Sequence, residues 1–261
     1  MPSRHLLEHR SVTLDLSAIK SADPFGLVYL AIYVGKLIEY EPLRLSINLG
    51  RGAFARHLNR MGVLDVLRRD TRVRVESGTI LPEFFGKGSN PRILELEQHT
   101  VADEDAAEAL SERLLDIIVL KRRRDLLARS ELFQTALLEI IANVSVHSGA
   151  RQVYVAAAAV NDRIHLAIGD SGMGIPARLK KSGIAEKLSC SGAIIKALEP
   201  GVSTRVGRGG LGLTTVSDQV REHGSYMAIR SGDGEVVIRG ENTTGRDNYH
   251  VLPGTMVEIA W

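Results

Sequence analysis

Three polar residues recur at a four-residue interval in a stretch that is otherwise apolar. Glu139, Asn143 and His147 lie in the run Phe133–His147, whose apolar residues follow helical spacing. On a helix, residues four apart share one face. A carboxylate, a carboxamide and an imidazole are costly to bury on such a helix unless they are paired or used. The pattern indicates either a functional face or a polar stripe that faces solvent.

A second polar group follows a predicted strand. The strand over Arg163–Gly169 runs directly into Asp170-Ser-Gly172-Met-Gly174. Glycines two residues apart let the backbone turn sharply and approach a ligand closely. The Asp170 carboxylate can accept a hydrogen bond from an amino group, such as the exocyclic nitrogen of adenine. A calcium loop or a simple turn fits this short pattern equally well.

The third group is rich in glycine. Gly207, Gly209, Gly210 and Gly212 lead into a predicted helix over Thr214–Glu222. Backbone N–H groups at a helix N-terminus, together with the helix dipole, favour phosphate. A flexible loop that ends in a glycine cap is the alternative. The segment does not have P-loop spacing, and no strand precedes it as in a dinucleotide-binding fingerprint.

Length and composition limit the number of domains and the classes of protein to which the chain can belong. The chain has 261 residues, of which 44% are hydrophobic, which is enough for one or two domains with a core. The net charge of +2 does not indicate nucleic-acid binding. The single cysteine, Cys190, excludes an internal disulfide and fits a reduced, cytoplasmic setting. We expect neither a signal peptide nor a membrane span, because no apolar run is long enough.

The remaining elements follow from hydrophobic periodicity. Strands and helices alternate in the first part of the chain, which predicts a small α/β unit with parallel strands. Gly78–Pro91 has no sustained period and is rich in Gly and Pro, so it is a predicted linker. Strands are expected at 11–16, 43–48, 72–76, 92–97, 152–159, 226–231, 235–239 and 254–259, helices at 25–39, 53–61, 64–69, 103–127 and the first half of 177–206, and a polar loop at 240–250.

In this order the motifs resemble those of the GHKL superfamily, whose ATP-binding domain is the Bergerat fold. The helix with E-x-x-x-N comes first, D-x-G-x-G follows a strand, a glycine-rich lid leads into a helix, and Gly254-Thr255 precedes the last strand. The resemblance covers roughly residues 92–261. It implies a two-layer α/β sandwich in which a mixed sheet carries helices on one face.

The resemblance also implies ATP and Mg²⁺ as cofactors and gives the residues of the helix their roles. Asn143 would ligate Mg²⁺ through its amide oxygen, with phosphate oxygens and waters as the other ligands. Glu139 would act as general base on a water or on a substrate hydroxyl. His147 has no role in the family pattern and is expected to be structural.

The nucleotide would be held by the glycine-containing segments. Asp170 would bind the adenine amino group, with support from Thr255. Gly172 and Gly174 would let the backbone pass close to the nucleotide. The lid glycines would wrap the phosphates, and these are Gly207, Gly209, Gly210 and Gly212.

A looser resemblance covers residues 10–70, which look like a STAS domain, the fold of anti-anti-sigma factors. It rests on Asp15-Leu-Ser17, Asp23-Pro-Phe-Gly26-Leu27, the strand 43–48 and the segment 58–67. Phospho-switch members carry Ser or Thr where this chain has Pro24-Phe25, so the resemblance implies a scaffold or docking module. A plain α/β subdomain is the alternative. We therefore expect a STAS-like domain over 1–77, a linker over 78–91 and an ATP-binding domain over 92–261.

Several functions remain open at this stage. The layout is similar to that of anti-sigma-type serine kinases, which implies a regulator that hydrolyses ATP or phosphorylates a protein partner on Ser or Thr. A nucleotide-gated interaction module with little turnover is the alternative, and an α/β protein without nucleotide is the third hypothesis. A sensor histidine kinase is disfavoured, because those enzymes commonly have Asn in place of Glu139 and because His99 lacks their flanking pattern. Relatives often dimerise, so a homodimer is among the expectations, and the sequence does not identify the protein partner.

Overall fold

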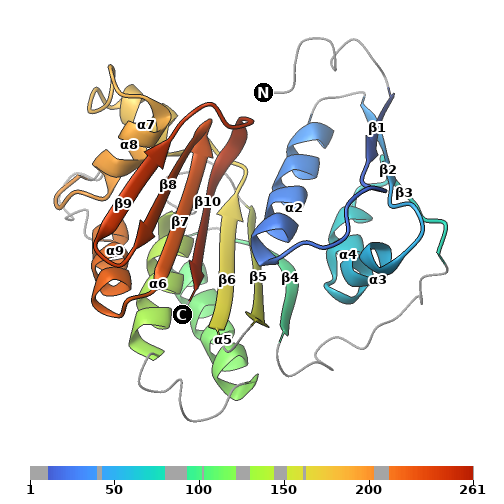
Figure 1. Cartoon of the computed structure of the whole chain (residues 1–261), viewed down its shortest axis with the longest axis horizontal. Coiled ribbons are helices and arrows are strands. Elements are labelled where there is room, and N and C mark those ends of the chain that lie inside the picture. Colours follow the sequence, from blue (N-terminus) through green and yellow to red (C-terminus); the bar gives the residue numbers. More distant parts are fainter. Residues whose placement is uncertain are drawn as a thin grey trace.

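The computed structural model describes residues 11–39, 43–79, 93–101, 103–121, 130–143, 152–160, 163–202 and 212–260. Two sheets organise these residues (Figure 1). In the smaller sheet, parallel strands lie in the order β1 (Ser11–Asp15), β2 (Arg44–Asn48) and β3 (Val73–Glu76). The connecting helices are α2 (Pro24–Ile38), α3 (Ala53–Arg60) and α4 (Val63–Leu67). The predicted α/β unit with parallel strands is confirmed.

Helix α2 begins where the sequence provides a cap. The Asp23 side chain accepts a hydrogen bond from the backbone N–H of Gly26 at 2.8 Å. Pro24 occupies the first turn, where its missing N–H leaves no hydrogen bond unmade. Leu27, Val28 and Ile32 on this helix are fully buried. A helix that is apolar on most sides must be covered on more than one side.

The larger sheet has the strand order β4-β5-β6-β10-β7-β8-β9. Its strands are β4 (Ile93–Thr100), β5 (Gln152–Val160), β6 (Arg163–Asp170), β7 (Tyr226–Gly232), β8 (Gly234–Arg239), β9 (Asn242–Arg246) and β10 (Leu252–Ala260). Every pair of neighbouring strands in this described sheet is antiparallel. The fold class is therefore confirmed with one correction, because a mixed sheet was expected. β6 and β7 run in the same direction, but β10 lies between them and pairs with both.

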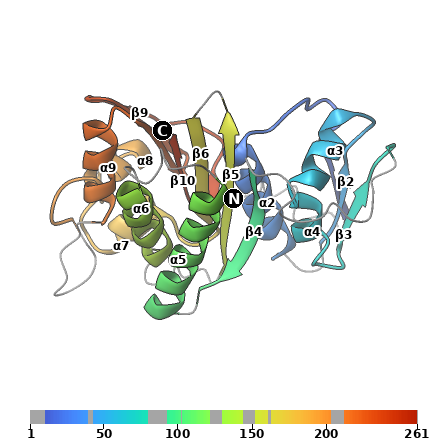
Figure 2. The same cartoon turned by 90° about the horizontal axis from the view of Figure 1, so that it is seen from below.

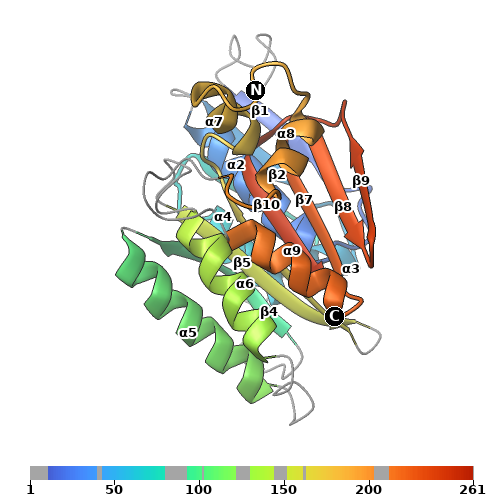
Figure 3. The same ribbon diagram turned by 90° about the vertical axis from the view of Figure 1, so that its left-hand side faces the viewer.

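Helices cover one face of this sheet. Figure 3 shows α5 (Glu104–Lys121), α6 (Ser130–Asn143) and α9 (Gly212–Glu222) lying across it. The shorter helices α7 (Ile175–Lys181) and α8 (Cys190–Ala197) lie on the same side of the sheet. Alternate residues of the strands point toward these helices and form a core with them, which includes Leu114, Ile141, Ile168, Val216, Ile229 and Val257.

Helix α2 packs on the opposite face of the larger sheet, over β5, β6 and β10 (Figure 2). Part of the surface beneath it is small, because the strands present Ala156, Ala167 and Gly169 there. A Cβ on Gly169 would lie 2.7 Å from Cδ1 of Ile32 and 3.1 Å from Cγ1 of Val28. One hydrophobic core thus joins α2, the smaller sheet and the back of the larger sheet.

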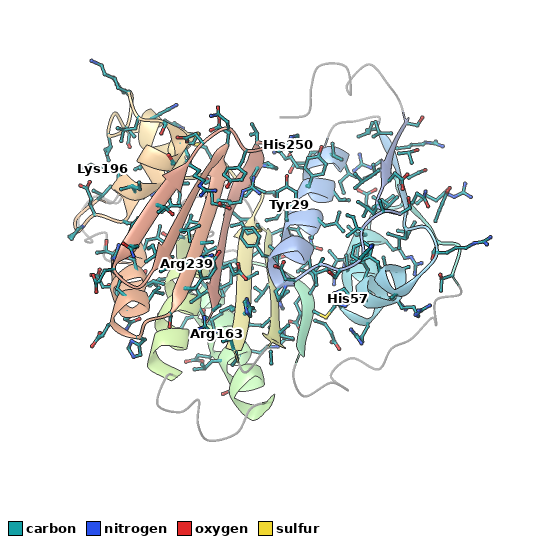
Figure 4. The ribbon with its side chains drawn as sticks, in the orientation of Figure 1. Tyr29, His57, Arg163, Lys196, Arg239 and His250 are labelled. Atoms are coloured by element: carbon teal, nitrogen blue, oxygen red, sulfur yellow. The ribbon has the colours of Figure 1, made fainter. Side chains whose placement is uncertain are left out.

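A polar seam borders this contact. The guanidinium of Arg230 on β7 lies 5.4 Å from the ring centroid of Tyr29 and 4.7 Å from that of Tyr249. It also donates a hydrogen bond to the carbonyl oxygen of His250 at 3.2 Å. Tyr29 and His250, labelled in Figure 4, mark the seam between α2 and the larger sheet. Cation–π contacts of this kind hold α2 against the sheet at its polar edge.

The polar loop expected over 240–250 is wrong in part, because β9 occupies Asn242–Arg246. All five residues of β9 are exposed and none is a large apolar residue. Its strand conformation comes from pairing with β8 and leaves no alternation in the sequence. Helix α8 likewise reaches into the second half of 177–206, where helix was not predicted.

Several predicted features lie outside the described residues. They are His147, the lid glycines Gly207, Gly209 and Gly210, most of the linker 78–91, and residues 122–127 of the long predicted helix. Among the helices that are described, none combines the length and the apolar character needed to cross a membrane.

Candidate functional site

Glu139 and Asn143 lie one turn apart at the C-terminal end of α6. Both side chains are half-buried. Within the described residues, neither side chain forms a hydrogen bond or an ion pair. Burial raises the pKa of the Glu139 carboxyl above its ordinary value, because desolvation penalises its charged form. A partly buried carboxylate with a raised pKa is suited to accept a proton.

The glycine-rich segment reaches this carboxylate. Gly212 is the first residue of α9, and a Cβ placed on it would collide with the carboxylate of Glu139 and lie 3.0 Å from its Cδ atom. Glycine therefore allows α9 to begin directly against Glu139. Of the predicted lid residues, Gly212 is the one that the structure describes.

Asp170 ends β6 with its side chain 4% exposed. Its Oδ1 accepts a hydrogen bond from the backbone N–H of Gly172 at 2.7 Å, which shapes the turn that follows. Gly174 has a φ of +79° and precedes α7, so glycine is required there by conformation. The predicted D-x-G-x-G turn thus sits at the end of a buried strand.

The start of β10 forms the other wall of this turn. Thr255 is the cross-strand neighbour of Asp170. Gly254 has a φ of +91°, and a Cβ on it would collide with the carbonyl oxygen of Asp170 and lie 2.9 Å from the backbone nitrogen of Gly172. The structure therefore brings Asp170, Gly172, Gly174 and Thr255 together, although β10 lies far downstream of the turn in the sequence.

Ser231 is a member of this cluster that sequence reasoning missed. It is the second-last residue of β7, is completely buried, and is the cross-strand neighbour of Thr255. Its hydroxyl oxygen lies 3.0 Å from Oγ1 of Thr255, 2.7 Å from the carbonyl oxygen of Gly254 and 2.9 Å from the backbone nitrogen of Ile175. The sequence carries one indication of it: Ser231 continues the inward-facing series of Met227 and Ile229, where a polar residue is unexpected.

Asn143 is a candidate protein ligand for Mg²⁺. Among the described residues, no group of three or more His, Cys, Asp or Glu side chains is placed to hold a metal ion. Asn143 offers a half-buried amide oxygen without a partner in that part of the chain. Mg²⁺ commonly takes one or two protein oxygens and completes its octahedron with phosphate oxygens and waters. The Asn143 carboxamide fits this donor set, with the ion supplying charge neutralisation at the phosphates when it is bound.

Comparison with known proteins finds a family match over most of these segments. Residues 128–248 match the family described as histidine kinase-, DNA gyrase B- and HSP90-like ATPase. The matched range includes α6, the D-x-G-x-G turn, the glycine-rich segment and Ser231, whereas Thr255 lies beyond its end. A comparison with curated proteins gave no match. Residues 128–248 of this chain therefore form a GHKL-type ATPase domain, an ATP-binding module.

Proposed function

We propose that the protein is a Mg-ATP-dependent regulator that hydrolyses ATP or phosphorylates a protein partner on Ser or Thr, in the manner of anti-sigma-type kinases. The observation that carries this proposal is Glu139. Its half-buried carboxyl has a raised pKa, has no hydrogen-bond or ion-pair partner among the described residues, and abuts the first residue of α9. A carboxylate so placed would take the proton from a water or from a Ser or Thr hydroxyl as that oxygen attacks the terminal phosphate.

The other residues take supporting roles in this proposal. Asn143 would hold Mg²⁺ against the phosphates, Gly212 would belong to the lid, and Asp170 with Thr255 would hold the adenine. The N-terminal α/β unit would act as a STAS-like docking module for a protein partner. The polar outer face of its sheet supports this role, because β1 exposes Ser11, Thr13 and Asp15 away from the helices.

The test of the proposed function is to follow radiolabelled γ-phosphate from Mg-ATP. Purified full-length protein is incubated with the nucleotide, and released phosphate and labelled protein are measured separately. Release or transfer that requires Mg²⁺ supports the proposal. Tight ATP binding with neither release nor transfer, both alone and with proteins captured from the cell extract, would contradict it.

Replacing Asn143 by Ala is expected to weaken ATP binding in Mg²⁺ by about 10- to 100-fold, because a metal ligand is lost. Binding of ATP in EDTA should change little, since the carboxamide acts through the ion. Titration calorimetry with and without Mg²⁺ measures both affinities. Asn242→Ala on the exposed strand β9 is the matched control. Equal losses of affinity in Mg²⁺ and in EDTA would argue against Asn143 as a ligand.

A second candidate function is supported by the packing of α2. Gly169 touches Val28 and Ile32 and directly precedes Asp170, so the N-terminal unit rests on the back of the strand that ends in the nucleotide site. In this alternative, ATP closes the site and thereby changes the surface that the N-terminal unit presents, with little turnover.

Under this alternative, ATP is expected to slow amide hydrogen exchange within Pro24–Ile38 at least about threefold, because a tighter β6 end restrains α2. Gly169→Ala should remove that protection and lower the free energy of unfolding by about 1–3 kcal/mol, since its methyl group overpacks against Ile32. Exchange followed by mass spectrometry, with Lys36→Ala as a control on the same helix, tests both effects. Unchanged exchange in α2 with saturating ATP would contradict this coupling.

A further inference from the structure

Asp170, Thr255 and Ser231 form one row across the neighbouring strands β6, β10 and β7. Residues directly opposite each other on adjacent strands point to the same face of the sheet. All three side chains therefore lie on the face that the helices cover, at the end of the sheet where the D-x-G-x-G turn begins.

The hydrogen bonds within this row have a defined direction. A serine hydroxyl has one proton to donate. The carbonyl oxygen of Gly254, 2.7 Å from Ser231, can only accept, so Ser231 donates to it. Toward the N–H of Ile175 at 2.9 Å, Ser231 therefore accepts. The proton in the 3.0 Å contact between Ser231 and Thr255 must then come from Thr255.

This direction fixes what Thr255 can offer a ligand. Because its proton is given to Ser231, Thr255 presents only lone pairs to any other partner. Asp170, its neighbour in the row, carries a carboxylate, which also accepts. A ligand atom that bonds directly to either of these side chains must supply a donor.

We propose that Ser231 is a positioning residue that holds the Thr255 hydroxyl as an acceptor and thereby makes the site prefer 6-amino purines over 6-oxo purines. Adenine presents an amino group at C6, whereas hypoxanthine presents a carbonyl oxygen that would face acceptors. The inference rests on the placement of Asp170 and Thr255 at the base and does not depend on turnover. Ser231 acts through Thr255 and does not itself touch the nucleotide.

The test compares the dissociation constants of ATP and inosine triphosphate, which differ only in the base. The wild-type protein is expected to prefer ATP on the order of 100-fold, because the inosine carbonyl would face the acceptors of Asp170 and Thr255 without a proton to share. Ser231→Ala should lower that ratio about tenfold, since Thr255 can then turn its proton toward the base. Ser111→Ala is the matched control, because Ser111 is also buried and its hydroxyl bonds within α5.

Thr255→Val and the double variant keep the proposal testable if Ser231→Ala is destabilised. Thr255→Val should lower the ratio as Ser231→Ala does, and the double variant should lower it no further, since one residue acts through the other. A merely structural role for Ser231 would weaken both nucleotides equally and leave the ratio unchanged, which would overturn the proposal. Failure of wild-type protein to bind either nucleotide would overturn it as well, whereas binding without phosphate release would contradict only the proposed enzymatic function.

Discussion

Asp170→Asn is expected to weaken ATP binding on the order of 100-fold, which is the loss expected for one buried charge-assisted hydrogen bond and a mispaired group. The Asn side chain can still accept from the N–H of Gly172, as Asp170 does at 2.7 Å, so the turn should be retained. Its amide nitrogen would then replace the second oxygen and set a donor against the adenine amino group. Titration calorimetry with ATP measures the loss, and circular dichroism checks that the fold is unchanged.

Asp15→Asn provides the matched control for this variant. Asp15 accepts from the backbone N–H of Ser17 at 2.9 Å, which is the same two-residue hydrogen bond, but it lies on the exposed side of the smaller sheet. Its replacement should leave ATP affinity unchanged. If Asp170→Asn binds ATP as tightly as Asp15→Asn does, the base is not held by Asp170.

The fold was predictable wherever local chemistry and periodicity agree. The N-terminus of α2 is predicted by Asp23, which caps the helix, and by Pro24 in its first turn. Strands β1, β2 and β7 are predicted by their alternating hydrophobicity. Strand β9 was not predictable, because all five of its residues are exposed and its pairing with β8 leaves no pattern in its own sequence. The packing of α2 on the larger sheet was equally hidden, since it depends on small residues in distant strands, and the sequence alone favours separate units for 1–77 and 92–261.

The candidate site was predictable to the extent that its residues form local motifs. Asp170, Gly172 and Gly174 lie within five positions of one another, and Glu139 and Asn143 share one helical face. Ser231 belongs to no motif, because its partners come from β10 and from the start of α7. A local motif reflects the conformation of one segment. The hydrogen bonds of Ser231 instead depend on three segments that meet in space, namely β7, β10 and the start of α7.

Glu139→Gln is expected to reduce phosphate release or transfer by about 10²- to 10⁴-fold while ATP affinity changes little, because a general base is lost and no nucleotide contact is removed. Gln is nearly isosteric and cannot accept the proton at neutral pH. The raised pKa of Glu139 also predicts the pH dependence of the wild-type rate. The base is available only above that pKa, so the rate should fall with acidity at a higher pH than an ordinary glutamate would give. Single-turnover phosphate release across a pH series measures both effects.

Glu258→Gln separates this role from a general effect of removing a buried acid. Burial also raises the pKa of Glu258, but its carboxylate pairs with His165 at 3.0 Å and lies on the α2-covered side of the sheet. That variant should keep the wild-type rate and pH profile. Folding provides a second check: burial penalises ionised Glu139 at neutral pH, so Glu139→Gln should melt no lower than the wild type. If a well-folded Glu139→Gln protein releases or transfers phosphate at the wild-type rate, Glu139 is not the general base. The proposal would then fail, and nucleotide-gated binding would be the function that fits.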